Sequence, residues 1–120
     1  MASAQVFRWD DIPWERLRED VWRRLIVGDR MMLAQFWIRK GAKVAMHRHH
    51  NEQISLVLSG AMKFVLENGS EHLVREGGVF VIPSNVVHAA EAVEDSVVVD
   101  VFSPPRDDWL RGDDAYLRRS

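Results

Sequence analysis

The sequence predicts an all-β domain of the sandwich or barrel type, and three observations support this. Short apolar runs recur along the chain, and several alternate so that every second side chain falls on one face of a strand. Turn residues separate these runs at short intervals, including the Asn68-Gly69 pair, a strong hairpin signal. With 120 residues, the chain has the length of one domain with its own core.

We therefore expect a single domain over residues 1–120. Its barrel covers about residues 20–103, with an N-terminal arm at 1–19 and a C-terminal tail at 104–120. The arm contains Pro13, which argues against a long helix. We expect the arm to lie across the domain.

The composition excludes several classes of protein. The formal net charge of −2 does not indicate a protein that binds nucleic acid or a membrane surface through general positive charge. No apolar run approaches the ~20 residues of a membrane span. Without cysteine, the chain has no disulfide framework and no thiolate metal site. The N-terminus has no apolar core of a signal peptide and turns acidic at once, so we expect a cytoplasmic protein.

The arm and the first two strands are rich in apolar side chains that need to be covered. We expect Trp9 and Trp14 to plug the domain, although one of them could instead stack on a ligand. Two strands follow at residues 20–27 and 31–38, joined by a tight turn at residues 28–30. Both faces of the second strand are largely apolar, so one faces the lumen and the other needs the arm, a second sheet or a partner. These two-sided strands favour a homodimer.

Further strands follow the middle of the chain. Residues 54–76 predict three strands with turns at Ser59-Gly60 and Asn68-Gly69, and His72 should face solvent. Residues 79–82 predict a short buried strand, and residues 96–103 the last long one.

The tail follows Pro104-Pro105 and predicts a short helix or an irregular docking segment. Asp107 or Asp108 could cap this helix. Four side chains should anchor the segment: Trp109, Leu110, Tyr116 and Leu117.

The segment from Gly41 to Gly60 carries the densest set of metal-ligating side chains. In an extended chain, His47, His49 and Gln53 share one face, and the alternation turns Glu52 away. Neighbouring imidazoles with one more donor are typical of a metal site, although exposed histidines in a polar loop remain the alternative. A β-bulge would reverse the parity and make Glu52 the ligand in place of Gln53.

A further ligand comes from His88, which opens a strand after a turn at Pro83, Ser84 and Asn85. Three neutral imidazoles and a neutral amide leave the charge of a divalent ion uncompensated. Such a site attracts an anionic ligand and acts as a Lewis acid. We expect one divalent ion per chain, either Ni, Zn, Mn, Fe or Cu.

Asp100 lies in the middle of a valine-rich strand, on the face that it shares with Val98 and Phe102. A carboxylate there is a candidate general acid or base, or else a structural partner of an arginine or an outward-facing side chain. Arg106 could clamp a substrate carboxylate or lie on the surface.

These stretches resemble the two motifs of the cupin superfamily. Gly41, His47, His49 and Gly60 are in register with the first motif, in which Gln53 stands where most cupins have glutamate. Gly77, Pro83 and His88 match the second motif, with Asn85 replacing a glycine. The resemblance implies a double-stranded β-helix, that is, a jelly-roll barrel with short N- and C-terminal extensions.

The sequence is similar, more narrowly, to the KdgF-type cupins of pectin degradation, which convert 4,5-unsaturated uronates into linear ketonised sugars. Their metal set corresponds to His47, His49, Gln53 and His88. Their catalytic pattern corresponds to Asp100, Phe102 and Arg106, followed by an acidic-aromatic-leucine stretch at residues 108–110. Many small cupins share this frame, so the resemblance could also be to a broad group whose members act on different substrates.

The resemblance implies a metal-dependent enzyme acting on a small anionic sugar, by ring opening and ketonisation. In this scheme Asp100 moves the proton, Arg106 holds a carboxylate and Phe102 shapes the pocket. Two other hypotheses use the same scaffold: a mononuclear metal-dependent dioxygenase, and a non-enzymatic cupin that binds a metal or a small ligand.

Overall fold

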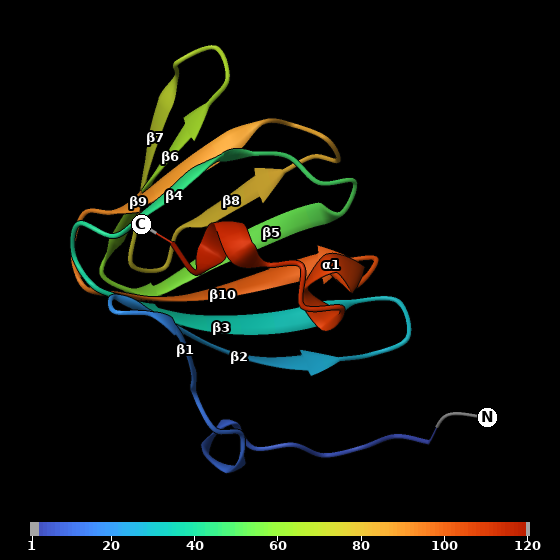
Figure 1. Cartoon of the computed structure of the whole chain (residues 1–120). Helices are drawn as coiled ribbons and strands as arrows, with labels where there is room; N and C mark the ends of the chain where they lie inside the picture. The colour runs from blue at the N-terminus through green and yellow to red at the C-terminus, as the bar shows by residue number, and fades with distance from the viewer. Residues whose placement is uncertain (1–2, 120) are drawn as a thin grey trace.

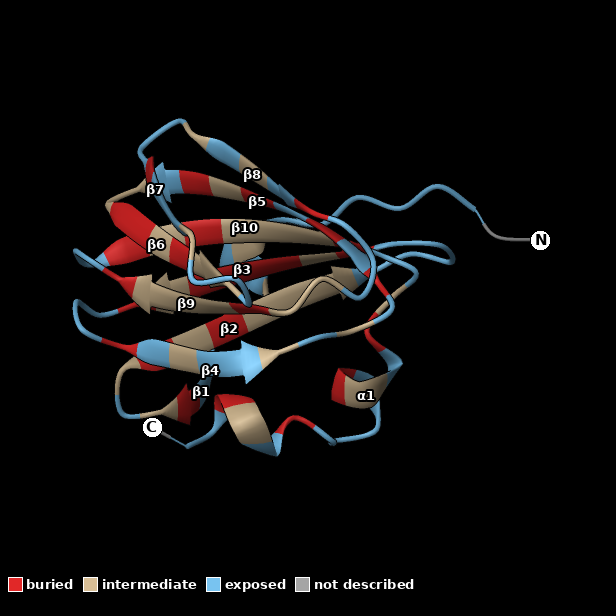
Figure 2. Ribbon diagram, turned by 90° about the horizontal axis from the view of Figure 1, so that it is seen from above, coloured by how far each residue is buried: buried red, intermediate tan, exposed pale blue. Residues whose placement is uncertain are grey.

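The computed structural model describes residues 3–119, which fold into two facing antiparallel sheets (Figures 1 and 2). The six-stranded sheet has the order β1 (Glu15–Arg18), β2 (Val21–Val27), β3 (Met32–Ile38), β10 (Ser96–Ser103), β5 (Glu52–Ser59) and β8 (Val79–Ile82). The four-stranded sheet has the order β4 (Lys43–His47), β9 (His88–Ala92), β6 (Ala61–Leu66) and β7 (Glu71–Arg75). The predicted all-β jelly roll is confirmed. No helix among the described residues is long and apolar enough to cross a membrane.

Most of the predicted strands are present at the predicted places. The strand pair β2 and β3 is joined at residues 28–31, and β10 begins at Ser96 and ends at Ser103. This last strand lies in the middle of the six-stranded sheet, because it pairs with β3 on one side and β5 on the other. His88 opens β9, and His72 is exposed on β7, both as predicted.

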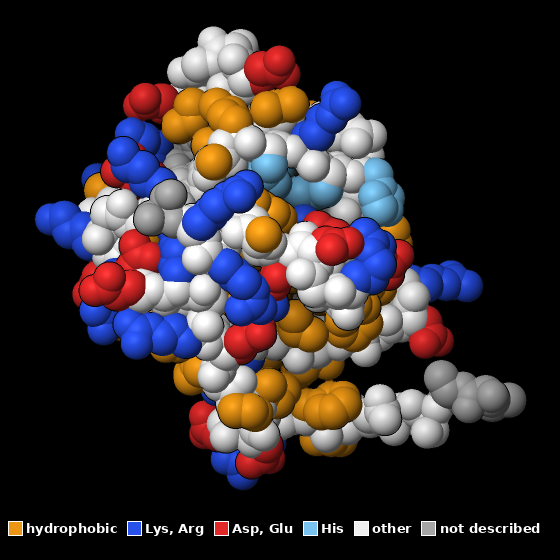
Figure 3. Space-filling view, in the orientation of Figure 1, with side chains coloured by type: hydrophobic (Ala, Val, Ile, Leu, Met, Phe, Trp, Pro, Cys, Tyr) orange, Lys and Arg blue, Asp and Glu red, His pale blue; other side chains and the backbone are white. Residues whose placement is uncertain are grey.

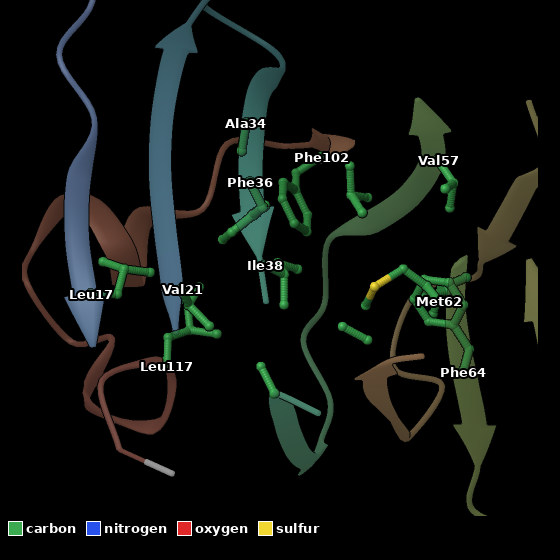
Figure 4. Close-up of a cluster of buried hydrophobic side chains, with 14 of the residues drawn as sticks. Leu17, Val21, Ala34, Phe36, Ile38, Val57, Met62, Phe64, Phe102 and Leu117 are labelled. Atoms are coloured by element: carbon green, nitrogen blue, oxygen red, sulfur yellow. The ribbon is translucent and has the colours of Figure 1, made fainter. Parts of the chain in front are cut away.

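The space between the sheets is filled by apolar side chains (Figure 4). The inner face of β3 contributes Met32, Ala34, Phe36 and Ile38, each 7% exposed or less. The other residues of this core include Val57, Met62, Phe64, Val98 and Phe102. The alternation along residues 31–38 predicts two apolar faces, and the structure turns the face with Met32, Ala34, Phe36 and Ile38 inward.

The outer face of the six-stranded sheet is also apolar along one continuous row. Strand register places Ile26, Leu33, Val101, Ile54 and Val81 side by side on five neighbouring strands. Of these, Ile54 is 39% exposed and Val81 is 52% exposed. Single exposed apolar residues are ordinary, but a row across five strands is a candidate interaction surface.

Residues 79–82 form the predicted strand, but the prediction that it is buried is wrong for most of its side chains. Strand β8 lies at the edge of the six-stranded sheet, where only Ile82 is buried while Val79 and Val81 face outward. An apolar run alone does not distinguish an edge strand from a central one.

The N-terminal arm does not plug the domain as predicted. Residues 3–8 are exposed and extend away from the sheets (Figure 1), and residues 1–2 of the predicted arm lie outside the described residues. A short 3₁₀ helix, Trp9–Asp11, precedes β1. The guanidinium of Arg24 lies 5.4 Å from the ring centre of Trp9 and 4.2 Å from that of Trp14, on the outer face of the sheet. The tryptophans therefore pair with a cation there and do not enter the core.

The C-terminal tail folds back over the sheets (Figure 1), and residue 120 of the predicted tail lies outside the described residues. It forms helix α1, Asp107–Leu110, and a 3₁₀ helix, Ala115–Leu117. Trp109 and Leu117 are buried anchors as predicted, and Tyr116 is partly buried against the core, but Leu110 is 53% exposed. Neither aspartate caps the helix, because the residue at the cap position is Arg106 and no side chain bonds there.

Candidate metal centre and cavity

Three histidines meet between the two sheets. His47 at the end of β4 and His88 at the start of β9 are cross-strand partners, and His49 follows β4 by two residues. One ligand nitrogen from each of these rings lies within 4.8 Å of the others, so the three side chains could hold one metal ion. Histidine side chains are visible on the molecular surface in Figure 3.

Two loops fix the position of these histidines. Asn85, in the predicted turn, takes a left-handed conformation with φ 65°, and its backbone N–H donates to the carbonyl of His49 at 2.8 Å. Ser84 donates through Oγ to the carbonyl of His50 at 2.6 Å. The two motifs, which are far apart in the sequence, are thus joined by hydrogen bonds beside the metal ligands.

Backbone contacts hold the histidine rings in the tautomer that leaves Nε2 free to bind a metal. The Nδ1 atom of each ring lies near the backbone carbonyl of a residue two positions away. The pairs are His47 with Ala45 at 2.8 Å, His49 with Asn51 at 3.0 Å and His88 with Val86 at 2.8 Å. Because a carbonyl only accepts, Nδ1 carries the proton and Nε2 keeps its lone pair. A hydrogen bond from the ring nitrogen that does not bind the metal orients the imidazole for binding.

Burial keeps these imidazoles neutral. It lowers the pKa values of His47 and His49 to about 4, and the pKa of His88 also lies below its usual range because of burial. The neighbouring cation of Arg106 and, for His47 and His49, their neighbouring histidines lower the pKa values further, while the backbone carbonyls oppose this shift. Neutral rings are the form that binds metal ions.

Gln53 points toward the same cluster, whereas Glu52 is exposed on the opposite face of β5. The Oε1 atom of Gln53 lies 3.1 Å from Nε2 of His49, and its Nε2 atom donates to Oγ of Ser55 at 2.9 Å. Two lone pairs that face each other at this distance repel unless a cation lies near both. The donor set thus fits a metal ion, and the strand keeps the parity that places Gln53 inward.

Asp100 faces Ser55 across the pair of strands β10 and β5. The fully buried hydroxyl of Ser55 donates to Oδ1 of Asp100 at 2.6 Å. Burial raises the pKa of Asp100 to about 6, although the bond from Ser55 and the charge of Arg106 oppose this shift. The carboxyl group is therefore able to gain or lose a proton close to neutral pH.

Arg106 is a buried residue, 2% exposed, and not a surface arginine. Its Nε and Nη2 atoms donate to the carboxylate of Asp108 at 3.0 and 2.8 Å, and Nη2 also donates to the hydroxyl of Tyr116 at 2.6 Å. The guanidinium lies 4.4 Å from the ring centre of Trp109 and 5.0 Å from that of Phe102. The tail thus holds the cation rigidly against the barrel.

A cavity joins these groups and has a volume of about 70 Å³. This is below the range of roughly 300–1,000 Å³ for small-molecule sites. Its lining is mostly apolar and comes from both sheets and from the tail. Six of the seven predicted site residues line it: His47, Gln53, His88, Asp100, Phe102 and Arg106. The seventh, His49, is part of the adjoining histidine cluster.

Sequence reasoning missed three residues that support this site. Asn51, 2% exposed, donates to the carbonyls of Pro104 and Pro105 at 2.6 and 3.1 Å and ties the histidine segment to the tail. Tyr116 was expected only as an anchor. Ser55 shares the strand parity of Gln53, and this signal was available in the sequence.

Comparison with known proteins identifies the family. A family model described as a cupin domain matches residues 36–102. This chain belongs to the cupin family. The cupin is 33% identical over 104 residues to the pectin degradation protein KdgF of Dickeya dadantii (strain 3937), covering 84% of this chain and 94% of that protein. The predicted resemblance to KdgF-type cupins is thereby confirmed.

Solved structures support the same relationship. The structure of KdgF from Halomonas sp. is 32% identical with a TM-score of 0.81, covering 88% of this cupin and 99% of that chain. An RmlC-like cupin from Shewanella frigidimarina NCIMB 400 is 25% identical with the same TM-score of 0.81, covering 89% and 96% of the two chains. The likeness thus extends over nearly the whole of both relatives.

Proposed function

We propose that this cupin is a metal-dependent enzyme that opens and ketonises a small anionic sugar, such as a 4,5-unsaturated uronate. One observation carries the proposal: a histidine cluster, the carboxyl of Asp100 and the guanidinium of Arg106 lie at one cavity. The 33% identity to a pectin degradation protein supports the choice of substrate class.

The proposed metal ligands are His47, His49, His88 and Gln53. A bound divalent ion would polarise an oxygen atom of the sugar and attract its negative charge. All four ligands are neutral, so the chain itself leaves the charge of the ion available to an anion. The identity of the ion follows from its availability as well as from these ligands.

Arg106 is proposed to hold the substrate carboxylate. Its hydrogen bonds within residues 3–119 use the Nε and Nη2 atoms and leave Nη1 for a ligand in the cavity. Asp108 and Tyr116 fix the plane of the guanidinium, and Phe102 lies against it as one wall of the pocket. A fixed plane favours a carboxylate in one orientation.

Asp100 is proposed to move the proton. Ring opening moves a proton from the anomeric hydroxyl to the carboxylate as the bond between the anomeric carbon and the ring oxygen breaks, which gives an aldehyde and an enolate. Ketonisation then moves this proton from the carboxyl group to the alkene carbon that does not bear the enolate oxygen. The two steps leave no net proton, so one carboxylate that acts first as base and then as acid is sufficient.

The test follows the ring-alkene absorbance of 4,5-unsaturated galacturonate with the metal-loaded protein and without protein. We expect faster loss of absorbance with the protein. Asp100→Ala should lower the rate roughly 10²–10⁴-fold, the usual contribution of acid–base catalysis. Asp29→Ala, which changes an exposed carboxylate in the β2–β3 connection, is the matched control and should keep the rate.

Two results would contradict this proposal. No acceleration by a folded, metal-loaded sample would remove the uronate as substrate, and oxygen consumption would then test the dioxygenase hypothesis. Full turnover by Asp100→Ala would remove Asp100 from the mechanism.

We also propose that the apolar row on the outer sheet face packs against a second copy of the chain. The row includes Leu33, Val101 and Ile54 on neighbouring strands, and a two-fold axis would place the same row on both partners. Val101→Lys should shift a dimer to monomer in sedimentation velocity. Leu73→Lys, at a residue 50% exposed on the other sheet, is the control. A monomeric parent protein would refute this assembly.

A further inference from the structure

A chain of hydrogen bonds links the histidine cluster to Asp100 through Ser55. Ser55 is neither a proposed metal ligand nor a proposed catalytic residue. Gln53 donates from its Nε2 atom to Oγ of Ser55 at 2.9 Å, and Ser55 donates to Oδ1 of Asp100 at 2.6 Å. Ser55 has 0% exposure, so water cannot replace either bond without a change in packing.

The direction of this chain is set at the carboxylate end. A carboxylate only accepts, so the single hydroxyl proton of Ser55 is used on Asp100. The Oγ atom then offers only lone pairs to Gln53, and the amide must present its N–H₂ group to Ser55. As a consequence the amide oxygen faces His49, where it lies 3.1 Å from Nε2.

We propose that Ser55 is a positioning residue that fixes which atom of the Gln53 amide faces the metal. The inference rests on the proposed function only in taking Gln53 as a ligand. With the amide turned over, an N–H₂ group would face the cation, and this group cannot act as a ligand. Ser55 therefore keeps a neutral amide in the orientation that a glutamate, with two equivalent oxygens, has without help.

The backbone supports this role. Gln53 and Ser55 share one face of β5, and Asp100 is the cross-strand partner of Ser55 on β10. The three side chains are thus held by two neighbouring strands in the middle of the six-stranded sheet, and not by loops. Rigid elements hold ligand geometry more tightly than loops do.

The test measures binding of Co²⁺ alone, by calorimetry and by its visible absorption spectrum. Ser55→Ala should weaken Co²⁺ binding about tenfold or more, as expected when a group that orients a ligand is lost, and should alter the spectrum. Ser96→Ala is the matched control, because Ser96 is a buried serine on the same sheet that bonds only to backbone groups, including Ala61 and Glu94. It should bind Co²⁺ as the parent does.

A double-mutant cycle separates orientation from general destabilisation. In a Gln53→Ala background, Ser55→Ala should change Co²⁺ affinity by less than about twofold, because no amide remains to be oriented. In a Gln53→Glu background its effect should also be small, since both carboxylate oxygens can bind. If Ser55→Ala does not fold, Asp100→Ala serves in the same cycle, because it removes the acceptor of the Ser55 proton. The part of its effect on Co²⁺ affinity that is lost in the Gln53→Ala background measures the orientation of the amide.

Three results would overturn the inference. These are an unchanged Co²⁺ affinity in Ser55→Ala, an equal loss with and without Gln53, and no binding of Co²⁺ by the parent protein. Failure of the uronate assay alone leaves this inference standing, because the readout is metal binding and not turnover.

Discussion

Metal binding by this cupin should resist acid over a range in which ordinary histidines lose their metal. The perturbation is a change from about pH 7.5 to about pH 5.5, across the pKa of an ordinary imidazole. Burial lowers the pKa values of His47 and His49 from 6.5 to about 4, and that of His88 is also lowered. Protons therefore compete for the ligand nitrogens of His47 and His49 only well below pH 5.5.

The magnitude follows from the fraction of unprotonated ligand. With an ordinary pKa, each histidine would weaken binding roughly tenfold over this range, so two would give roughly a hundredfold loss. With pKa values of about 4, His47 and His49 together change the affinity by less than about 10%. Asp100 adds its own effect, because its pKa of about 6 lies inside the range and protonation removes a negative charge near the site.

Equilibrium dialysis against Co²⁺ at both pH values measures this difference. Asp100→Asn removes the titrating carboxyl, and its Co²⁺ affinity should fall less than about tenfold between the two pH values, because the pKa of His88 is also lowered. The parent protein should lose more affinity than this variant, by the effect of Asp100. A hundredfold loss in Asp100→Asn would refute the reasoning, since it would mean that the histidines titrate as if they were exposed.

Three other outcomes are expected. Gly69→Ala should lower the free energy of unfolding in urea by about 1–2 kcal/mol, because its φ is +86° with open space around it. Gly60→Ala should cost about 1–3 kcal/mol more, because an added Cβ would lie 2.3 Å from the carbonyl oxygen of Asp95; equal losses would contradict this. Arg106→Lys should raise KM for the uronate about tenfold with a smaller change in kcat, because a lysine cannot keep both bonds to Asp108 and also offer a fixed donor to the substrate, and an unchanged KM would exclude the clamp. Co²⁺ at 100 times its Kd should stabilise the protein by about 2.7 kcal/mol, and His47→Ala should remove this increment; a gain that survives the substitution would place the ion elsewhere.

The amino-acid sequence alone predicts the class of fold and the candidate site residues. Alternation divided the side chains of β3 between two apolar faces and placed Asp100 inward, because strand side chains have a fixed period of two. The same parity turned Gln53 inward and Glu52 outward, and the spacing of turns located most strands. These are local properties, which depend only on neighbouring residues.

Which residues become neighbours in space, and which become buried, follows from the folded structure and not from the sequence pattern. An apolar run such as residues 79–82 has the same pattern at an edge as in the middle of a sheet, so strand order decided its exposure. Trp9 and Trp14 pack against Arg24 on the outer face of the sheet. Leu110 stays exposed, because the burial of a side chain depends on the surface opposite it. The cross-strand register of β5 and β10 brought Ser55 to Asp100, and the return of the tail buried Arg106 beside Tyr116. Contacts between residues 45 apart in sequence, as Ser55 and Asp100 are, arise from how the sheets pair, and no local pattern encodes them.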